Sequence, residues 1–291
     1  MRGWAGGAGG IVSSSDGGVH WGVQSRRPVR QLVATDTTHA WALSRDQTLR
    51  TTDGGAHWRS LGAQGLLRLS VADDAHGYAI ERLYYLVRTN DGGVSWTPLN
   101  GPTGLQSLCF ANARTGWIAR GGTVWTTHDR AAHWTKRTLT RSAGLGELYC
   151  SGNNVWDVVH DGAAAGTEKY TVFHSPDGGA SWHVRFGSFL GSDPRIPRVS
   201  NYAGPIAAQS DGSAVLEGSC APCGAGSVTF VRVPGGRGTV ANVLPGPLAF
   251  ASRTLGLAVL TPSPRGTPTI YRTTTGGRTW VRTFTSRLLR P

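Results

Sequence analysis

Carboxylates are the residues of this chain that could act as general acids or bases. Acid–base hydrolysis of a glycosidic bond needs two carboxyl groups that flank the bond to be broken. No acid outside the repeated motif described below stands in a recognisable acid or nucleophile context, so we interpret these residues as ordinary loop residues. They are Glu81, Glu147, Glu168, Glu217, Asp157, Asp161, Asp193 and Asp211.

Basic residues predict the charge of a partner. The chain carries 29 Lys and Arg against 17 Asp and Glu, a formal net charge of +12, and only Lys136 and Lys169 are lysine. This balance favours an anionic partner, although a GC-rich genome would also produce a solvated arginine surface. Specific nucleic-acid binding is disfavoured, because nucleic-acid modules interleave exposed aromatics with basic residues and the aromatics here belong to repeats.

Four cysteines indicate neither a zinc site nor a cofactor site. Cys220 and Cys223 form a C-x-x-C pair without the second pair of a zinc ribbon. Cys109 and Cys150 fall in the equivalent strand of neighbouring repeats, where we interpret them as small buried hydrophobes. We therefore predict no metal, no cofactor and no catalytic residue.

The chain is organised around imperfect copies of the nonamer RTTDGGAHW, residues 50–58. Asp followed by Gly-Gly is a tight-turn signal, because the carboxylate accepts backbone N–H groups and glycine permits positive φ. The tryptophan is expected in the second strand of this hairpin, covering the seam to the next repeat. We interpret the following residues as structural: Asp16, Asp53, Asp91, Asp129, Asp177, Trp21, Trp58, Trp96, Trp134, Trp182 and Trp280.

The period of the repeat predicts the fold. Successive nonamers recur at about 38 residues in the first half of the chain and at longer intervals later, and Pro234-Gly235-Gly236 marks a degenerate copy. Seven repeats of four short strands predict an all-β, seven-bladed β-propeller in a single domain, residues 1–291. The blades are expected to end near residues 23, 61, 99, 139, 186, 243 and 284.

Each repeat is predicted to contain four strands, innermost to outermost. In the third repeat these are 66–72, 77–81, 83–89 and 94–99, so that the nonamer turn joins the third strand to the fourth. A second aromatic landmark marks the start of the second strand in most repeats. This position is occupied by the aromatic residues Trp4, Trp41, Tyr78, Trp117 and Trp156, and by the aliphatic residue Leu257.

The pattern S/T-x-D-x-G-x-x-W is that of Asp-box, or BNR, repeats. Together with the upstream segments FANARTGW and VATDTTHAW, the chain resembles propellers of the photosystem II stability and assembly factor family and its bacterial relatives. The resemblance covers essentially the whole chain and implies a propeller. It implies less about function, because Asp boxes occur in sialidases as well as in non-enzymatic scaffolds.

A sialidase-like exo-glycosidase is the alternative function. Arg195-Ile196-Pro197 is similar to the segment that supplies one arginine of the sialidase triad. In sialidases, however, that segment precedes the first Asp box, whereas here it follows the fifth. We therefore favour a non-enzymatic binding or assembly scaffold.

The ends of the chain and the CAPC segment carry further expectations. The first repeat lacks an innermost strand, and residues 285–291 are expected to supply it and so close the first blade. The chain as given shows no signal peptide and no transmembrane run, whereas the family resemblance implies an extracytoplasmic, secreted or periplasmic location. In that compartment a Cys220–Cys223 disulfide is expected.

Extra residues in the later repeats predict the working surface. They fall in 161–169, 187–198, 220–226 and 261–268, connections expected at the propeller face opposite the nonamer turns. A monomer binding a protein or other anionic partner through that face is our prediction from the sequence. The predicted binding residues are Arg137, Arg141, Arg195, Arg198, Arg265 and Lys169.

Overall fold

The chain folds into antiparallel sheets built from consecutive strands. A computed structural model describes residues 2–45, 47–62, 65–164, 167–188, 199–219, 226–263 and 265–290. Seven sheets are present in these residues, one with three strands and six with four, and in each sheet the neighbours follow one another along the chain. This up-and-down order is the organisation of propeller blades, as the repeat period predicts.

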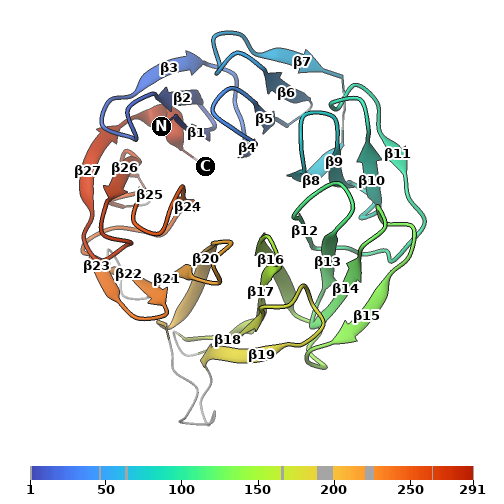
Figure 1. Cartoon of the computed structure of the whole chain (residues 1–291). Helices are drawn as coiled ribbons and strands as arrows, with labels where there is room; N and C mark the ends of the chain where they lie inside the picture. The colour runs from blue at the N-terminus through green and yellow to red at the C-terminus, as the bar shows by residue number, and fades with distance from the viewer. Residues whose placement is uncertain are drawn as a thin grey trace. The chain divides into compact units, whose positions relative to one another are not determined.

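The contacts group the chain into two compact units. The first unit consists of residues 1–119, 124–137 and 286–291, and it holds four sheets (Figure 1). Its strands are β1 Gly3–Gly7, β2 Gly10–Ser14, β3 Gly22–Ser25; β4 Gln31–Ala34, β5 Ala40–Leu43, β6 Thr48–Thr51, β7 Arg59–Leu61; β8 Leu66–Val71, β9 Gly77–Glu81, β10 Leu86–Thr89, β11 Thr97–Pro98; β12 Ser107–Phe110, β13 Gly116–Arg120, β14 Thr123–Thr127, β15 Thr135–Thr138.

The second unit consists of residues 120–123 and 138–285 and holds the remaining three sheets. Its hairpin β17–β18 is the longest, because residues 161–164 and 167–169 extend the strands. The extra residues 161–169, which the sequence predicted to be an irregular connection, are therefore partly β-strand. The strands are β16 Leu145–Ser151, β17 Asn154–Ala164, β18 Thr167–Ser175, β19 His183–Ser188; β20 Tyr202–Ala208, β21 Ala214–Ser219, β22 Val228–Val233, β23 Arg237–Val240; β24 Leu248–Phe250, β25 Gly256–Leu260, β26 Thr269–Thr273, β27 Val281–Thr285.

The third sheet shows how well the strand prediction performs. The first two strands of that sheet agree with the prediction to within a residue. The third strand is wrong at its start, because residues 83–85 lie in a turn and β10 begins only at Leu86. The fourth strand shrinks to Thr97–Pro98. The degenerate sixth copy does form a hairpin, β22 and β23, around residues 234–236.

Aromatic landmarks fill the seams between successive sheets. Trp41 of β5 is fully buried in a cluster with Leu66 and Leu69 of β8 and Ala79 of β9. Tyr78 of β9 packs in turn with residues of the fourth sheet. The landmark therefore covers the seam to the next sheet within the unit, and the second and third sheets are apolar on both faces.

The nonamer tryptophans pack against the preceding sheet in the chain and not against the next one. The prediction for them was therefore wrong both in the strand that carries them and in the seam that they cover. Each residue lies just before the fourth strand and not in it, as Trp58 does before β7. The ring of Trp96 packs edge-on against Trp41 of the preceding sheet, with ring centroids 6.4 Å apart, and Trp280 lies 4.4 Å from Phe230. Sheet twist rotates the outer hairpin relative to the inner strand, and here that hairpin reaches back over the preceding sheet.

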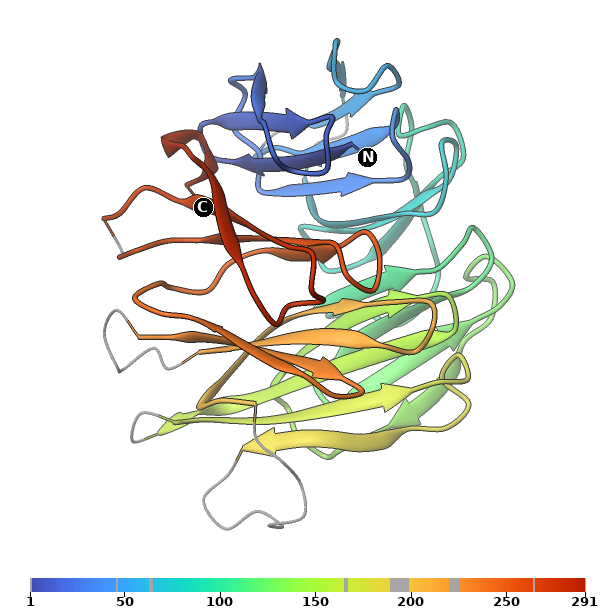
Figure 2. The same ribbon diagram turned by 60° about the vertical axis from the view of Figure 1, so that its left-hand side comes forward.

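The C-terminal residues contact the first sheet, but they form a 3-10 helix where a strand was expected. The helix η2, Arg287–Leu289, lies beside β1 and β2, dark red against blue in Figures 1 and 2. Ala8 N–H donates to the Arg290 carbonyl at 2.6 Å and Gly9 N–H to the Leu288 carbonyl at 3.0 Å. An added Cβ at Gly7 would lie 2.5 Å from the Arg290 carbonyl oxygen, so this approach requires glycine.

Replacing the buried Leu289 tests how much this contact stabilises the first sheet. Leu289 is 3% exposed, so Leu289→Ala should lower the free energy of unfolding by about 2–5 kcal/mol in urea titrations. The exposed neighbour substitution Arg287→Ala serves as the control and should change it by less than about 0.5 kcal/mol. Equal stability of Leu289→Ala and the parent protein would show that the tail does not hold the first sheet.

Candidate functional site

The nonamer turns are closed by side chains. In the second sheet the Thr51 hydroxyl donates to Asp53 at 2.8 Å and accepts the Gly55 N–H at 2.8 Å, while Asp53 accepts the His57 N–H at 3.0 Å. The two glycines of this turn adopt φ of 74° and 87°, values that other residues avoid. The aspartate therefore holds a loop that would otherwise leave its backbone N–H groups without partners.

The same bonds recur in turns that depart from the motif. In the fourth sheet Arg130 and Ala131 replace the glycines and still adopt φ of 65° and 67°. In the seventh sheet Thr275 replaces the aspartate, and its hydroxyl accepts the Thr279 N–H at 2.9 Å. Because the geometry survives these changes, the turn is set by several bonds and not by one residue.

Hydrogen bonds keep the nonamer carboxylates ionised. The hydroxyl and backbone N–H of Ser95 lower the pKa of Asp91 to about 2. Ser181 does the same for Asp177, whose pKa also lies at about 2. A carboxyl group held in the anionic form accepts hydrogen bonds and cannot donate a proton near neutral pH, so these residues are unsuited to general acid chemistry.

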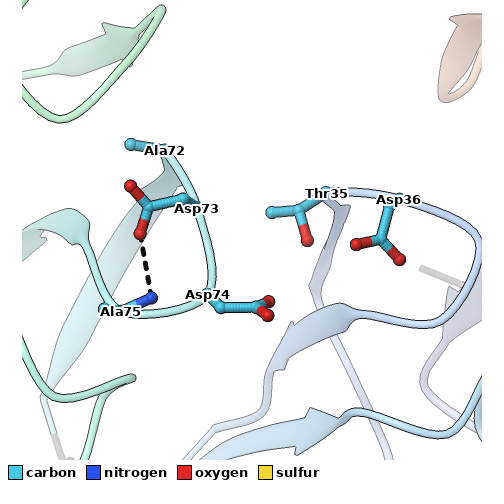
Figure 3. A pocket seen from close by; sticks show the side chains of 6 residues that line it. All are labelled: Thr35, Asp36, Ala72, Asp73, Asp74 and Ala75. Carbon is cyan, nitrogen blue, oxygen red and sulfur yellow. Dashed lines mark hydrogen bonds between the residues drawn. The ribbon is translucent and has the colours of Figure 1, made fainter.

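A second group of acids lies in the turns between first and second strands. Asp36 and Asp74 face each other across a cavity of about 440 Å³ that Thr35 and Asp73 also line (Figure 3). His39 contacts both carboxylates, with Nδ1 at 2.7 Å from Asp36 and Nε2 at 3.1 Å from Asp74. The ligand atoms are close enough to hold a metal ion. However, both ring nitrogens already contact carboxylates and Arg50 lies 3.7 Å from Asp74, so we interpret the group as an ion-paired link between two sheets.

The predicted basic residues are exposed wherever they are described. Arg141 follows β15, Lys169 lies on β18, and Arg265 lies between β25 and β26, all in the second unit. Arg137 lies on the outermost strand β15 and not in a connection. Arg195 and Arg198 fall outside the described residues, as do Asp193 and the Arg195-Ile196-Pro197 segment.

Three polar residues that the sequence left unconnected meet in the fifth sheet. His160 Nδ1 lies 2.8 Å from a carboxylate oxygen of Glu168, and its Nε2 lies 3.8 Å from Glu147, too far for a hydrogen bond. The second Glu168 oxygen accepts the Ala203 N–H of β20 at 3.1 Å, and Glu147 accepts the Tyr149 hydroxyl at 2.8 Å. We call Glu147, His160 and Glu168 the acid–histidine cluster.

The acid–histidine cluster holds its histidine as a cation. Burial alone would lower the pKa of His160, but Glu147 and Glu168 outweigh it and raise the pKa to about 9. The charged ring then lies between two carboxylates, and Glu168 also ties the fifth sheet to the sixth. Sequence reasoning missed this cluster because the insertion that carries Glu168 reads as a loop, whereas strand pairing brings it beside His160.

Two further acids of the second unit are buried. Asp157 is 0% exposed and Glu217 is 1% exposed. Burial raises the pKa of Asp157 well above its usual value and that of Glu217 to about 8. Glu217 accepts the Gly246 N–H at 3.1 Å through one oxygen, while its other oxygen and both oxygens of Asp157 accept no hydrogen bond. A pKa of about 8 leaves the Glu217 carboxyl group mostly neutral at pH 7.

The remaining candidate acids have ordinary roles in the structure. Asp211 accepts the backbone N–H of Ser213 at 2.9 Å and lies 3.1 Å from Arg253. Asp161 is partly exposed at the extended hairpin, and Glu81 ends strand β9. None of these contacts brings two carboxylates to opposite sides of one cavity.

The cysteines require a correction. Cys109 and Cys150 are both disulfide-bonded, so their interpretation as simple buried hydrophobes was wrong. They are also only partly buried. The sequence gave no sign of these disulfides. Whether a cysteine can form one depends on the distance and orientation of its Cβ atom relative to that of its partner, and strand spacing alone does not report these. Cys220 and Cys223 lie outside the described residues.

Comparisons with known proteins establish the fold. No family model and no curated protein matches the sequence. Among solved structures, YCF48 bound to D1 peptide is 14% identical with a TM-score of 0.59, covering 87% of this chain and 81% of that one. YCF48 from Cyanidioschyzon merolae is also 14% identical with a TM-score of 0.59, covering 90% and 86%. The N-terminal domain of Nup159 is 11% identical with a TM-score of 0.55, covering 94% and 84%.

These similarities confirm the all-β, seven-bladed propeller that the repeats predict. They lie below 25% identity and therefore report the fold of the chain and not its activity.

Replacing Glu217 tests whether its carboxyl group is neutral in the folded protein. A raised pKa in the folded state means that stability is fully present below the unfolded pKa and is lost as pH rises through about 8. The amide of Glu217→Gln keeps an oxygen that accepts the Gly246 N–H, but it cannot ionise. The variant should therefore not show the loss of unfolding free energy with rising pH, which amounts to at most ~1.4 kcal/mol per pH unit in the parent protein. Urea titrations of the two proteins should converge near pH 4.5 and diverge towards pH 8, with Glu217→Gln the more stable. Parallel curves would contradict the assignment.

Proposed function

We propose that this protein is a non-enzymatic binding propeller that holds an anionic segment of a protein partner on basic connections of its second unit. The observation that carries the proposal is the exposure of Arg141 and Arg265 on those connections, and of Lys169 near the start of strand β18, in a chain of net charge +12. Propellers present such connections together at one end of their sheets. A neighbour of the same fold, YCF48, has been solved bound to a D1 peptide, which supports peptide binding as a use of this architecture.

The finer family assignment belongs to the same proposal. We infer that the nonamer turns are Asp boxes and that the chain acts as an assembly-factor-like scaffold of the type the sequence resembles. The hydroxyl-to-carboxylate bond repeated in sheets one to five supports the first inference. No helix in the described part of the chain is long and apolar enough to cross a membrane.

Binding in place of catalysis is supported by how the acids are used. One carboxylate oxygen of Glu168 contacts His160 and the other accepts the Ala203 N–H. The nonamer carboxylates accept hydrogen bonds within their own turns. A retaining or inverting glycosidase needs one carboxyl group free to protonate the leaving group and a second on the other side of the sugar. The sialidase-like alternative therefore finds no specific support in the described residues.

An extracytoplasmic location completes the proposal. The bonded state of Cys109 and Cys150 supports it, because structural disulfides persist in oxidising compartments and are rare in the cytosol.

Charge reversal tests the binding surface. Fluorescence anisotropy with a labelled oligoglutamate peptide should show about tenfold weaker binding for Arg141→Glu/Arg265→Glu, because the attraction to the peptide becomes repulsion. Binding by the parent protein should weaken with salt as screening shortens the Debye length below ~8 Å. The control Arg114→Glu/Arg278→Glu makes the same charge change in turns at the nonamer end of their sheets and should retain binding.

Two results would contradict the proposed function. Equal losses in the two double variants would mean that only net charge matters. Turnover of fluorogenic sialosides or other glycosides by the purified protein would establish an enzyme.

Thiol chemistry tests the proposed compartment. Protein purified from its natural host and alkylated under denaturing conditions without reductant should carry no label on Cys109 or Cys150 in peptide mass spectra. Labelling should appear after reduction, and the reduced protein should unfold at lower denaturant concentration, because a lost native disulfide typically costs ~2–5 kcal/mol. Full labelling before reduction would place the protein in a reducing compartment.

A further inference from the structure

An exposed aromatic turn joins the second and third strands of the third sheet. Leu83, Tyr84 and Tyr85 are 70%, 51% and 43% exposed, respectively. In the part of the chain that the structure describes, no other three consecutive large apolar side chains are exposed together. The equivalent connection of the first sheet, residues 7–10, is glycine and alanine. We call residues 82–85 the aromatic turn.

The backbone of the aromatic turn is strained at Tyr84. The Tyr84 N–H donates to the Glu81 carbonyl at 2.8 Å, and the Glu81 N–H donates to the Tyr85 carbonyl at 3.1 Å. This geometry is a three-residue hairpin loop whose last residue takes the left-handed conformation, normally glycine or asparagine. Tyr84 adopts it with φ of 61°, which costs about 1–2 kcal/mol for a bulky residue. The shorter connection between the second and third strands of the fourth sheet has a glycine in the left-handed region, Gly121 with φ of 54°.

The strained residue is anchored through its backbone, while its ring remains in solvent. The Tyr84 carbonyl accepts the N–H of Leu105 at 3.3 Å, and Leu105 is 0% exposed. The conformation is therefore fixed by the connection between the third and fourth sheets. Tyr84 therefore adds strain to the fold while about half of its surface stays exposed, as is found for residues at recognition sites.

A groove of mixed polarity begins at Glu81, the residue before the aromatic turn. A cavity of about 370 Å³ is lined by Glu81 together with Leu66, Val87, Val94 and Trp96. Val94 is 60% exposed at its edge. The turn offers exposed apolar side chains, and the groove that starts at Glu81 adds those of Leu66, Val87 and Trp96, all in the first unit. Apolar side chains of a bound segment would be covered on both sides.

Arginine side chains at and near the aromatic turn favour a negatively charged ligand. Arg82 is the first residue of the turn after Glu81 and is exposed, as is Arg30. Burial and the neighbouring charges of Arg82 and Arg68 lower the pKa of Arg30, so these cations repel one another. Glu81 is the acid at this site, and the cations outnumber it. Carboxylates on the ligand would relieve this repulsion.

We propose that the aromatic turn and its groove bind a peptide segment of a partner protein in which acidic residues alternate with apolar ones. The apolar side chains cover Leu83 and Tyr84 and enter the groove, and the carboxylates meet Arg82 and Arg30. Alternation suits the site because successive side chains of an extended segment point to opposite sides. The site lies in the first unit and uses none of the basic connections of the proposed function, so either can fail without the other.

The experiment measures fluorescence anisotropy with three labelled peptides of equal length, which alternate Asp with Leu, Lys with Leu, and Asp with Ser. The parent protein should bind the Asp–Leu peptide at least tenfold more tightly than the other two. Leu83→Ser/Tyr84→Asn should weaken that binding about tenfold, since apolar anchors dominate such interfaces. Asparagine at position 84 tolerates the left-handed conformation, so thermal unfolding should not shift downwards.

Matched variants separate this site from general stickiness and from the basic connections. Val19→Ser/Val23→Ser removes exposed apolar surface elsewhere in the first unit and should leave Asp–Leu binding within twofold of the parent. Arg82→Glu should weaken it about tenfold. Arg141→Glu/Arg265→Glu should retain it while losing oligoglutamate binding.

Four outcomes would overturn the proposal. Equal affinity for the Asp–Ser peptide would show that binding depends on charge alone. Equal affinity for the Lys–Leu peptide would show that binding does not depend on the charge of the peptide. Sedimentation of the parent protein, but not of Leu83→Ser/Tyr84→Asn, with phosphatidylserine vesicles and no peptide binding would assign the turn to a membrane surface. A dimer in analytical ultracentrifugation that this double variant abolishes would assign it to a second copy of the chain.

Discussion

The second, third and sixth sheets are each apolar on both faces, and this is the constraint on which the other features depend. A sheet of four short strands cannot bury two faces by itself, so neighbours must cover them. The landmarks Trp41 and Tyr78 lie at 0% exposure in such seams. Burial of one such aromatic ring, with about 150–250 Å² of surface, stabilises the seam by about 4–6 kcal/mol. The repeat therefore keeps a large residue at this position, whereas other positions drift.

The nonamer turns serve the seams by fixing the outer hairpin. The Asp53 carboxylate and the Thr51 hydroxyl close the turn. The tryptophan that follows such a turn then meets the preceding sheet, as Trp96 meets Trp41. Because the turn is closed by several hydrogen bonds, single substitutions such as Thr275 for aspartate leave the geometry intact. Local redundancy explains why the motif degenerates along the chain while the packing persists.

Sequence reasoning succeeded where a single local signal fixes the structure. Gly-Gly turns predict the hairpins because the turn signal is local, and the repeat period predicts the number of sheets and the propeller because it recurs along the whole chain. It failed where the outcome depends on three-dimensional neighbours. The aromatic run at residues 83–85 has the composition of a strand, but the chain must turn there to pair Leu86 with Ile80. Pairing of His160 with Glu168 likewise depends on the register of a hairpin. The exposure of the described basic residues was predictable, because long charged side chains are rarely buried.

The two units differ in how they use ionisable groups. In the first unit the pKa values of Asp16, Asp53 and Asp129 are lowered by hydrogen bonds from the backbone and side chains of their turns. Such groups stabilise the fold above their unfolded pKa, and that contribution is lost as pH falls; because they are exposed, each contributes little. The second unit has His160 and Glu217 with pKa values raised to about 9 and about 8, and the pKa of Asp157 is raised as well.

Groups with raised pKa values act in the opposite direction. Their contribution is complete below the unfolded pKa and is lost as pH rises through the folded one. Asp157 follows Trp156 where Ala42 follows Trp41, so an acid has replaced an aliphatic residue at a seam. Acid should therefore weaken the nonamer turns of both units, since Asp177 of the second unit has a lowered pKa as well, and alkali should act on the buried groups of the second unit. The same scaffold thus acquires two opposite pH dependences from where its carboxyl groups lie: hydrogen-bonded in exposed turns, or buried between sheets.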